Sequence, residues 1–323
     1  MPSPAVLELT HLAKRFSKRL DAVERLARAF GARISEQTVR AVDGVSFAVR
    51  QGEVVGLVGE SGCGKSTVGR LACGLTEPSE GTVRYKGKPP AGTQRPQMIF
   101  QDPFASLNPR MRVEEIVGEA PVVHGLVGKN EIKTYVEGIL ESVGLDPSYR
   151  RRYPHQFSGG QRARIGIARA LAVRPEFLVC DEAVAALDVS IQAQVLNLFL
   201  DLRERLGLTY LFISHDLGVV RHLAQRVVVM YLGRVVEIAT TAELYARPNH
   251  PYTQALLAGV PRLDRQRRAY LPIKGEIPSP LAPPPGCHFH PRCPRAMERC
   301  RREAPALREI APGRLSACHL NDG

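Results

Sequence analysis

The chain has 323 residues, of which 44% are apolar, and a formal net charge of +12. This length and apolar content suffice for one large domain with an appendage, or for two modest domains. No run approaches the roughly 20 apolar residues of a membrane-spanning helix, and the N-terminus lacks a signal-peptide pattern, so we expect a folded protein that stays in the cytoplasm. The charge is compatible with nucleic acid, phosphates or an acidic membrane surface, but no aromatic residues interleave with the basic clusters as a single-strand binding platform requires.

The first part of the chain alternates strand and helix patterns. We predict a strand at 6–9, a charged helical insert around 17–30 and a second strand at 45–49. The apolar run at 54–58 is too short for a helix and rich in β-branched residues, which indicates a buried parallel strand. A helical pattern follows at 67–75.

A glycine-rich segment between this strand and this helix has the composition of a phosphate-binding loop. Its residues are Gly59, Glu60, Ser61, Gly62, Cys63, Gly64, Lys65, Ser66 and Thr67. Glycines let successive backbone N–H groups turn toward one anion, and the following helix adds its positive end. Lys65 is expected to reach the β- and γ-phosphates of a nucleoside triphosphate, and Ser66 to ligate Mg²⁺. An ordinary glycine turn, the alternative, does not explain the position between a buried strand and a helix.

Helical periodicity dominates the middle of the chain. Helices are predicted at 113–124, 131–143 and 161–172. We therefore expect a mainly helical subdomain, at about 105–175, inserted into an α/β domain with a parallel sheet.

A second glycine-rich segment precedes the last of these helices. It consists of Phe157, Ser158, Gly159, Gly160 and Gln161. Backbone amides at a helix N-terminus form another anion site by the same physics. A chain with a single phosphate loop needs this second site only if two chains face each other and each completes the other's site.

Two further buried strands, at 177–180 and 209–213, are separated by a helical pattern at 189–206. The first of these strands leads into Asp181 and Glu182, at the carboxyl edge of the sheet, where open α/β sheets bind ligands. Asp181 is expected to hold Mg²⁺, commonly through water, and Glu182 to orient or deprotonate the attacking water. Two acids that merely end a strand beside a helix cap are the alternative, which the phosphate loop disfavours.

The chain becomes proline-rich beyond about residue 245, and we expect little regular structure there apart from a short helix at 251–258. Four of the seven cysteines lie in this tail, namely Cys287, Cys293, Cys300 and Cys318. Four thiolates suit an iron–sulfur cluster or zinc. The spacing lacks the Cys-x2-Cys knuckle of most structural zinc sites, and we favour iron–sulfur. Incidental free thiols are the alternative.

Six segments, in order and at fitting spacing, resemble the motifs of ABC transporter ATP-binding subunits, and the resemblance covers about residues 5–323. They are the Walker A loop (Gly59 to Ser66), the Q-loop (Gln101), the signature (Phe157 to Gln161), the Walker B end (Asp181 and Glu182), the D-loop (Asp188) and the switch histidine (His215). The resemblance implies a P-loop NTPase fold. It also implies a head-to-tail dimer, with ATP between Walker A of one subunit and the signature of the other.

The same resemblance implies roles for residues that would be unremarkable alone. Gln101 is expected to contact the metal and the attacking water, and His215 to contact the γ-phosphate and orient Glu182. Phe16 is a candidate for stacking on adenine, with a core phenylalanine as the alternative. The chain departs from the family in Phe157, where leucine is usual, and at 183–185, where Ala-Val-Ala replaces Pro-Thr-Ser and puts the symmetry of the two ATP sites in question.

The segments 101–110 and 250–257 and the cysteine-bearing end resemble oligopeptide and dipeptide permease ATPases, and nickel importers share much of this pattern. The resemblance implies an ATPase domain at 1–245 and a C-terminal extension at 246–323, with a four-iron four-sulfur cluster or zinc in addition to ATP and Mg²⁺. The implied partners are a second ATPase subunit, identical or a paralogue, two transmembrane permease subunits and an extracytoplasmic peptide-binding protein. The implied location is the cytoplasmic face of the cell membrane.

Rival functions are weaker on the sequence. DNA-repair and chromosome-organising ATPases share the signature, but they carry long coiled-coil insertions, and no sustained heptads occur here. Nucleic acid is therefore not expected as a partner. A P-loop GTPase would need an Asn-Lys-x-Asp guanine reader, which is missing. A non-catalytic regulatory subunit is a further alternative, and the sequence leaves open whether the cargo is a dipeptide, a longer peptide or nickel.

Overall fold

The computed structural model describes residues 4–17, 38–90, 95–102, 106–259 and 275–322. The helical insert predicted around 17–30 lies outside these residues, except for Ser17, which ends a strand.

Eight strands of the described residues form one mixed sheet in the order β10-β11-β9-β8-β3-β7-β6-β5. They are β3 (Val54–Val58), β5 (Gln97–Ile99), β6 (Phe177–Asp181), β7 (Thr209–Ser214), β8 (Arg226–Tyr231), β9 (Arg234–Thr240), β10 (Arg308–Ala311) and β11 (Arg314–Ser316). The pairs from β5 to β8 are parallel, as the short apolar runs predicted. The remaining pairs are antiparallel, so the expectation of a parallel sheet is correct only for the part from β8 to the edge strand β5.

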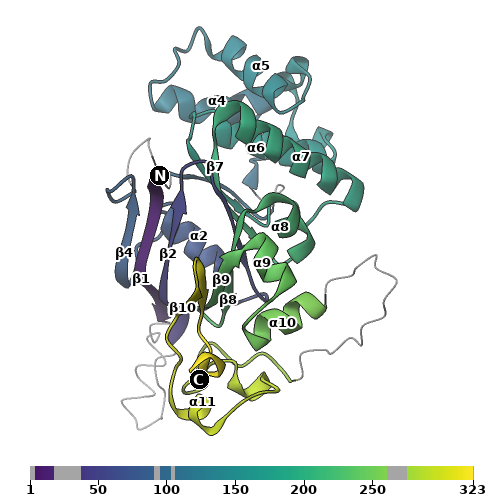
Figure 1. The fold of residues 1–323 in the computed structure, drawn as a ribbon. Helices are drawn as coiled ribbons and strands as arrows, with labels where there is room; N and C mark the ends of the chain where they lie inside the picture. The colour runs from purple at the N-terminus through teal and green to yellow at the C-terminus, as the bar shows by residue number, and fades with distance from the viewer. Residues whose placement is uncertain (1–3, 18–37, 91–94, 103–105, 260–274, 323) are drawn as a thin grey trace, which may run out of the picture.

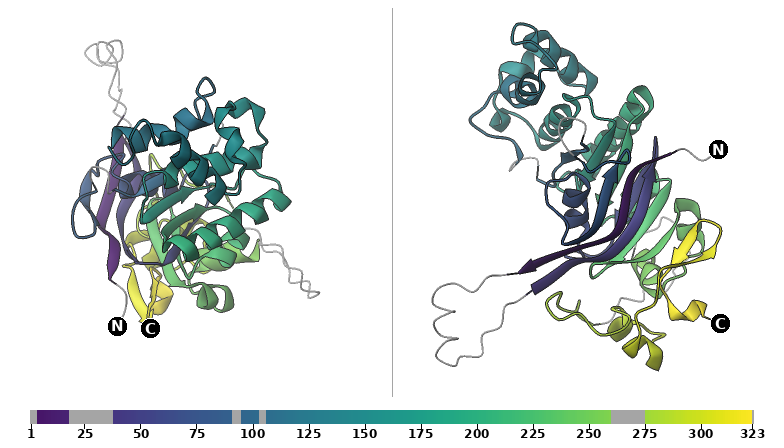
Figure 2. Two further views of the ribbon diagram at one scale, coloured as in Figure 1. Left: turned by 90° about the horizontal axis from the view of Figure 1, so that it is seen from above. Right: turned by 90° about the vertical axis from the view of Figure 1, so that its left-hand side faces the viewer.

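A second, antiparallel sheet has the order β2-β1-β4 within the described residues. It consists of β1 (Ala5–Ser17), β2 (Thr38–Arg50) and β4 (Glu80–Tyr85). In the right-hand view of Figure 2, β1 and β2 run side by side and their paired ends project from the rest of the molecule. Helix α2 (Lys65–Ala72) and this sheet bury their apolar residues in one cluster with residues of β3, β6, β7 and β8.

The other helices share a second apolar cluster with the large sheet. They are α4 (Val113–Val123), α5 (Ile132–Ser142), α6 (Gly159–Leu171), α7 (Val189–Leu206), α8 (Leu217–Leu223), α9 (Thr241–Ala246) and α10 (Pro251–Ala258). The predicted helices among them are confirmed to within two residues at each end. In Figure 1 α4, α5 and α6 gather at the end of the molecule opposite the C-terminus.

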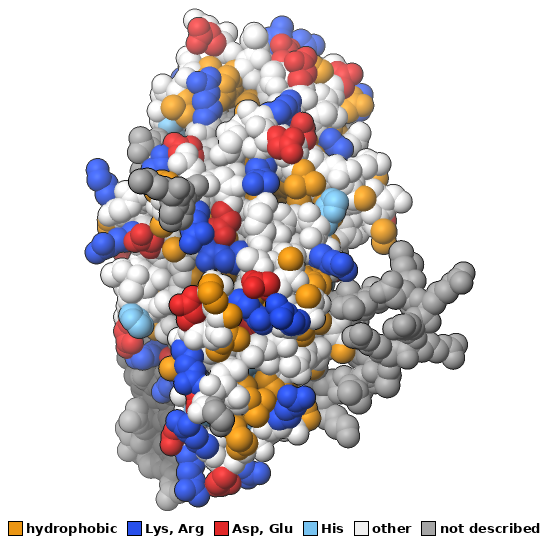
Figure 3. Space-filling model, viewed as in Figure 1, with side chains coloured by type: hydrophobic (Ala, Val, Ile, Leu, Met, Phe, Trp, Pro, Cys, Tyr) orange, Lys and Arg blue, Asp and Glu red, His pale blue; other side chains and the backbone are white. Residues whose placement is uncertain are grey.

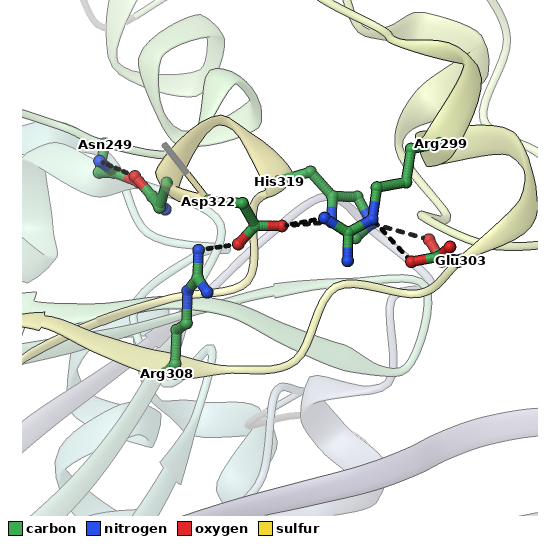
Figure 4. A network of polar contacts seen from close by, with 7 residues as sticks. Asn249, Arg299, Glu303, Arg308, His319 and Asp322 are labelled. Atoms are coloured by element: carbon green, nitrogen blue, oxygen red, sulfur yellow. Dashed lines mark hydrogen bonds and ion pairs between the residues drawn. The ribbon is translucent and has the colours of Figure 1, made fainter.

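The C-terminal segment contains more regular structure than its proline content indicated, so that prediction was wrong. It adds β10, β11, the helix α11 (Glu298–Arg302) and two short 3-10 turns, His290–Arg292 and His319–Asn321. Strand β11 pairs with β9, which joins the segment to the large sheet. Figure 4 shows Asp322 between His319 and Arg308, and Arg299 beside Glu303, so polar contacts hold the end of the chain.

The surface carries both signs of charge. On the face shown in Figure 3, Lys and Arg side chains are interspersed with acidic ones and do not merge into one basic patch. Within the described ranges, no helix is long and apolar enough to cross a membrane.

Candidate nucleotide-binding site

The phosphate loop lies between β3 and α2, and its glycines are required by close backbone contacts. Gly64 caps α2 with φ 104°, and a Cβ there would lie 2.1 Å from the carbonyl oxygen of Ala41 on β2. A Cβ on Gly59 would lie 2.2 Å from the carbonyl oxygen of Met230 on β8. The loop is therefore held between two strands that only glycine lets approach so closely.

Lys65 is buried at the base of this loop, with 5% of its surface exposed. Its Nζ donates to the carbonyl oxygens of Gly59 at 2.8 Å and Glu60 at 3.0 Å. These neutral carbonyls hold the ammonium group without cancelling its charge, and a buried charge favours a partner of opposite sign. The position suits a phosphate.

Two of the three side chains predicted to contact Mg²⁺, Ser66 and Asp181, meet across the sheet edge, whereas the third, Gln101, is hydrogen-bonded to Glu182. The Ser66 hydroxyl donates to Oδ1 of Asp181 at 2.9 Å. Burial raises the pKa of Asp181, the hydrogen bond from Ser66 opposes this, and the charge of Glu182 adds to it. Hydroxyl and carboxylate oxygens are the ligands that a hard divalent cation prefers, and such a cation would compensate the buried carboxylate.

The structure brings the three predicted catalytic side chains together at Glu182. Its Oε2 accepts a hydrogen bond from Nε2 of Gln101 at 2.7 Å, and its Oε1 lies 3.2 Å from Nδ1 of His215. The Glu182 backbone has φ 48° and its N–H donates to the carbonyl of Ile213. Both oxygens of the Glu182 carboxylate are thus held by neighbouring side chains, close to the Ser66–Asp181 pair that suits a metal ion. A carboxylate held in this way can accept a proton from a bound water.

The second glycine-rich segment is separate from the phosphate loop. Ser158 and Gln161 cap α6 reciprocally, with N–H to side-chain oxygen distances of 3.3 and 3.1 Å. A Cβ on Gly160 would lie 2.4 Å from Cγ2 of Ile191 in α7, the helix that Asp188 caps. Among the described residues, no hydrogen bond joins this segment to the phosphate loop.

Phe16 is 46% exposed near the end of β1, which excludes the core alternative. It pairs with Val39 of β2, two residues from Ala41, whose carbonyl faces Gly64 of the phosphate loop. Nζ of Lys14 lies 5.3 Å from the centre of the Phe16 ring. The ring is on β1, which pairs with β2, the strand that contacts the loop, and stacking on adenine stays a prediction.

The four tail cysteines are free thiols, and the backbone N–H of Cys287 donates to the carbonyl oxygen of Cys300 at 2.8 Å. Burial raises the pKa of Cys287 to about 11, with contributions from Cys300, Cys293 and Cys318. As donor atoms, four thiolates suit a soft metal or a cluster. However, no three His, Cys, Asp or Glu side chains in the described ranges are arranged to hold a metal ion. The expectation of an assembled metal site is not met by this arrangement of the thiols.

Sequence reasoning missed two residues that contact the phosphate loop from the C-terminal half. The hydroxyl of Tyr252 accepts a hydrogen bond from the backbone N–H of Glu60 at 2.9 Å, and Arg292 forms an ion pair with the Glu60 side chain. They are 192 and 232 positions from Glu60, so no local pattern could have indicated the contacts.

Comparisons with known proteins agree on one family. A family model described as ABC transporter matches residues 42–185, and one described as oligopeptide/dipeptide transporter, C-terminal region, matches 236–300. Among solved structures, cbiO1 of Clostridium perfringens, described as part of the ABC transporter complex cbiONQ, has a TM-score of 0.61 at 25% identity and covers 75% of this chain and 91% of its own. The ATP-binding cassette MJ0796, at 24% identity, supports the fold, with a TM-score of 0.62 over 73% of this chain and 98% of its own.

Curated relatives are similar over nearly their whole length. The putative oligopeptide transport ATP-binding protein YkfD of Bacillus subtilis is 52% identical over 298 residues, which is 88% of this chain and 91% of that protein. The oligopeptide transport ATP-binding protein AppF of the same organism is 49% identical over 328 residues, 98% of this chain and 97% of its own. A putative peptide import ATP-binding protein of Brucella ovis is 52% identical over 291 residues, which is 87% of this chain and 92% of that protein. With its phosphate loop, its oriented Glu182 and these relatives, the chain belongs to the ABC transporter ATP-binding proteins of the oligopeptide and dipeptide transporter family.

Proposed function

We propose that the chain is the ATP-hydrolysing subunit of an importer of oligopeptides or dipeptides. The observation that carries hydrolysis is the orientation of Glu182 by Gln101 and His215, one residue after Asp181. The family, and the names of relatives about 50% identical, support peptides as cargo.

In this proposal, each side chain of the site has one task. Lys65 binds the β- and γ-phosphates, and Ser66 and Asp181 hold Mg²⁺, which neutralises phosphate charge when it is bound. Glu182 takes a proton from the attacking water, and Gln101 and His215 orient that carboxylate. The 2.7 Å contact from Gln101 supports this division, because a general base must be held within hydrogen-bonding reach of its water.

A complete ATP site requires two subunits. The backbone amides of Ser158 to Gln161 lie at the start of α6, where a helix N-terminus favours an anion, yet they have no hydrogen bond to the chain's own phosphate loop in the described residues. We assign this segment, with Asp188 at the start of the neighbouring helix, to the ATP held by a second subunit. That subunit is an identical chain or a paralogue.

We assign residues 1–245 to the ATPase domain, with a helical subdomain at about 105–175, and 246–323 to a C-terminal extension. The helical region carries a groove of about 400 Å³ between α4 and α5, lined by residues that include Met111, Gly118 and Ile132. This groove is suited to a segment of a transmembrane permease subunit. Two such subunits, supplied by an extracytoplasmic peptide-binding protein, would hold the ATPase at the cytoplasmic face of the membrane.

The four tail cysteines are proposed to bind a four-iron four-sulfur cluster, with zinc as the alternative. The donor chemistry of the thiols and the backbone hydrogen bond between Cys287 and Cys300 support this proposal. Since three of them do not yet form a ligand arrangement in the described residues, binding would have to draw them together. A bound group would cross-link this segment, whose helices and strands are short.

The function is tested with the intact complex, purified by a tag on this chain and reconstituted in vesicles. ATP hydrolysis is expected to rise when the binding protein and short peptides are supplied, and to stay low with the binding protein alone. Stimulation by nickel and not by peptides would assign the chain to the nickel importers. A complex that hydrolyses no ATP under any of these conditions would contradict an enzymatic role.

A further inference from the structure

Glu60, the second residue of the phosphate loop, is fixed from the C-terminal half of the chain. Its carboxylate accepts two hydrogen bonds from Arg292, with Nη1 to Oε2 at 2.7 Å and Nη2 to Oε1 at 2.9 Å. Its backbone N–H donates to the hydroxyl of Tyr252. Its carbonyl oxygen in turn accepts from Nζ of Lys65. One loop residue thus links the tail to the lysine that faces the phosphates.

The pair between Arg292 and Glu60 is a shielded one. The Arg292 side chain is 5% exposed and that of Glu60 is 21% exposed. The guanidinium carbon lies 5.9 Å from the centre of the Tyr231 ring, and Nη1 lies 3.4 Å from the Tyr231 hydroxyl. A bidentate pair in this setting restricts both side chains, because the Arg292 guanidinium is almost completely removed from water.

Arg292 is itself held in place by the tail around it. Phe289 is buried, with its ring centre 5.3 Å from those of Tyr231 and Tyr252. Nδ1 of His288 lies 3.1 Å from the carbonyl oxygen of Leu232. These contacts seat the segment 288–292 at the end of β8, the strand whose Met230 carbonyl also abuts Gly59 of the loop. Tail, strand end and phosphate loop therefore pack as one unit.

We propose that Arg292 is a positioning residue for the nucleotide site: acting through Glu60, it holds Lys65 and the loop amides in the geometry that binds a triphosphate. The inference rests on the proposed function, in which ATP occupies this loop. It makes the C-terminal segment part of the nucleotide site. A shift of this segment would reach Glu60 through the ion pair with Arg292 and through Tyr252, on which Phe289 packs.

A double-mutant cycle in the intact complex tests the proposal. Arg292→Gln and Glu60→Gln are each expected to weaken Mg·ATP affinity by about tenfold, and the double variant by little more, because all three lack the same pair. Arg292→Lys should restore part of the affinity, since it keeps the charge but loses the bidentate geometry. The turnover number at saturating ATP should fall much less than the affinity, which separates positioning of the loop from the chemical step.

Amide hydrogen exchange supplies a readout that ATP chemistry does not affect. In nucleotide-free protein, Arg292→Gln should speed exchange at residues 59–66. Arg299→Gln is the matched control. Arg299 pairs with Glu303 and Asp322 in the same tail, and within the described residues it has no contact with the phosphate loop. It should leave both the affinity and the exchange of the loop unchanged.

Three outcomes would overturn the inference. They are unchanged ATP affinity of folded Arg292→Gln, full additivity of the two single variants, and an equal loss of affinity in Arg299→Gln. If Arg292→Gln does not fold, Arg292→Lys must still show weaker affinity than wild type, or the proposal fails. Failure of the wild-type protein to bind ATP would contradict the proposed function itself, and the two failures are thereby distinguished.

Discussion

The hydroxyl of Ser66 donates a hydrogen bond to the carboxylate of Asp181, 115 positions later in the chain, at 2.9 Å. The contact joins the first turn of α2 to the end of β6 and sets a hydroxyl and a carboxylate side by side. Glu182 follows directly, with its two oxygens held by different side chains. Asp181, one of the two proposed metal ligands, and Glu182, the proposed base, are thus consecutive residues with different partners.

Replacement of Glu182 by Gln should leave ATP binding intact and slow hydrolysis by about a hundredfold or more, since the amide cannot take a proton from water. Binding of labelled ATP and single-turnover hydrolysis measure the two effects. Glu176→Gln is the matched control. Glu176 is an exposed acid that forms an ion pair with Lys86 just before β6, and its variant should hydrolyse ATP normally. Near-normal turnover of Glu182→Gln would remove this residue from the role of base.

Asp181→Asn should raise the thermal midpoint of the nucleotide-free protein at neutral and alkaline pH. Burial raises the pKa of Asp181, so its ionised form costs stability once the pH exceeds that raised value. The advantage of the variant should therefore shrink as the pH falls and the wild-type carboxyl becomes protonated. Thermal unfolding from about pH 4, near the ordinary aspartate pKa, up to about pH 8 measures this. A larger advantage at acidic pH would contradict the direction of the shift.

The same variant should lose its response to Mg·ATP. The divalent ion is expected to stabilise the wild type by binding its carboxylate, whereas the amide of the variant offers a weaker, neutral ligand. Equal stabilisation of both proteins by Mg·ATP would show that Asp181 does not hold the ion.

Lys65 and Ser158 should serve different ATP molecules. In a mixed dimer, Lys65→Ala on one chain and Ser158→Arg on the other damage the same site twice and leave the second site intact. Both changes on one chain damage both sites. ATP binding stoichiometry with differently tagged subunits distinguishes the arrangements. If both substitutions on a single chain preserve an intact site, the head-to-tail assignment is wrong.

Gly160→Ala should lower the free energy of unfolding by about 1 to 3 kcal/mol, because the new Cβ would lie 2.4 Å from Cγ2 of Ile191 and force α6 and α7 apart. Gly166→Ala in the same helix is the control. A Cβ there has nothing within 4 Å, and the better helix propensity should stabilise by about 0.5 to 1 kcal/mol. Denaturant unfolding measures both. A loss of stability in both variants would point to a general intolerance of α6 and not to this contact.

Protein purified without oxygen should contain iron and sulfide, and Cys293→Ala or Cys318→Ala should abolish both. Cys73→Ala, a buried thiol at the end of α2, should retain the metal and is the control. Elemental analysis and visible absorbance are the measurements. Stoichiometric zinc without iron would select the alternative centre, and absence of both would leave four incidental thiols.

The sequence alone determined the features that depend on local patterns. The apolar run Val54–Val58 is β3 and the helical pattern Val189–Leu206 is α7, residue for residue, because strand and helix periodicities are properties of short segments. The glycines of the phosphate loop follow from the same local chemistry. The resemblance carried by six motifs then indicated the family, which the relatives confirm.

Only the tertiary structure decided which distant residues meet. Gln101 reaches Glu182 across 81 positions, and Arg292 reaches Glu60 across 232. The tail strand Arg314–Ser316 is too short for a periodic pattern to identify it, and it is a strand because it pairs with β9 and β10. Such contacts depend on how the helices and the tail pack against the sheet. Neither composition nor local periodicity specifies that packing.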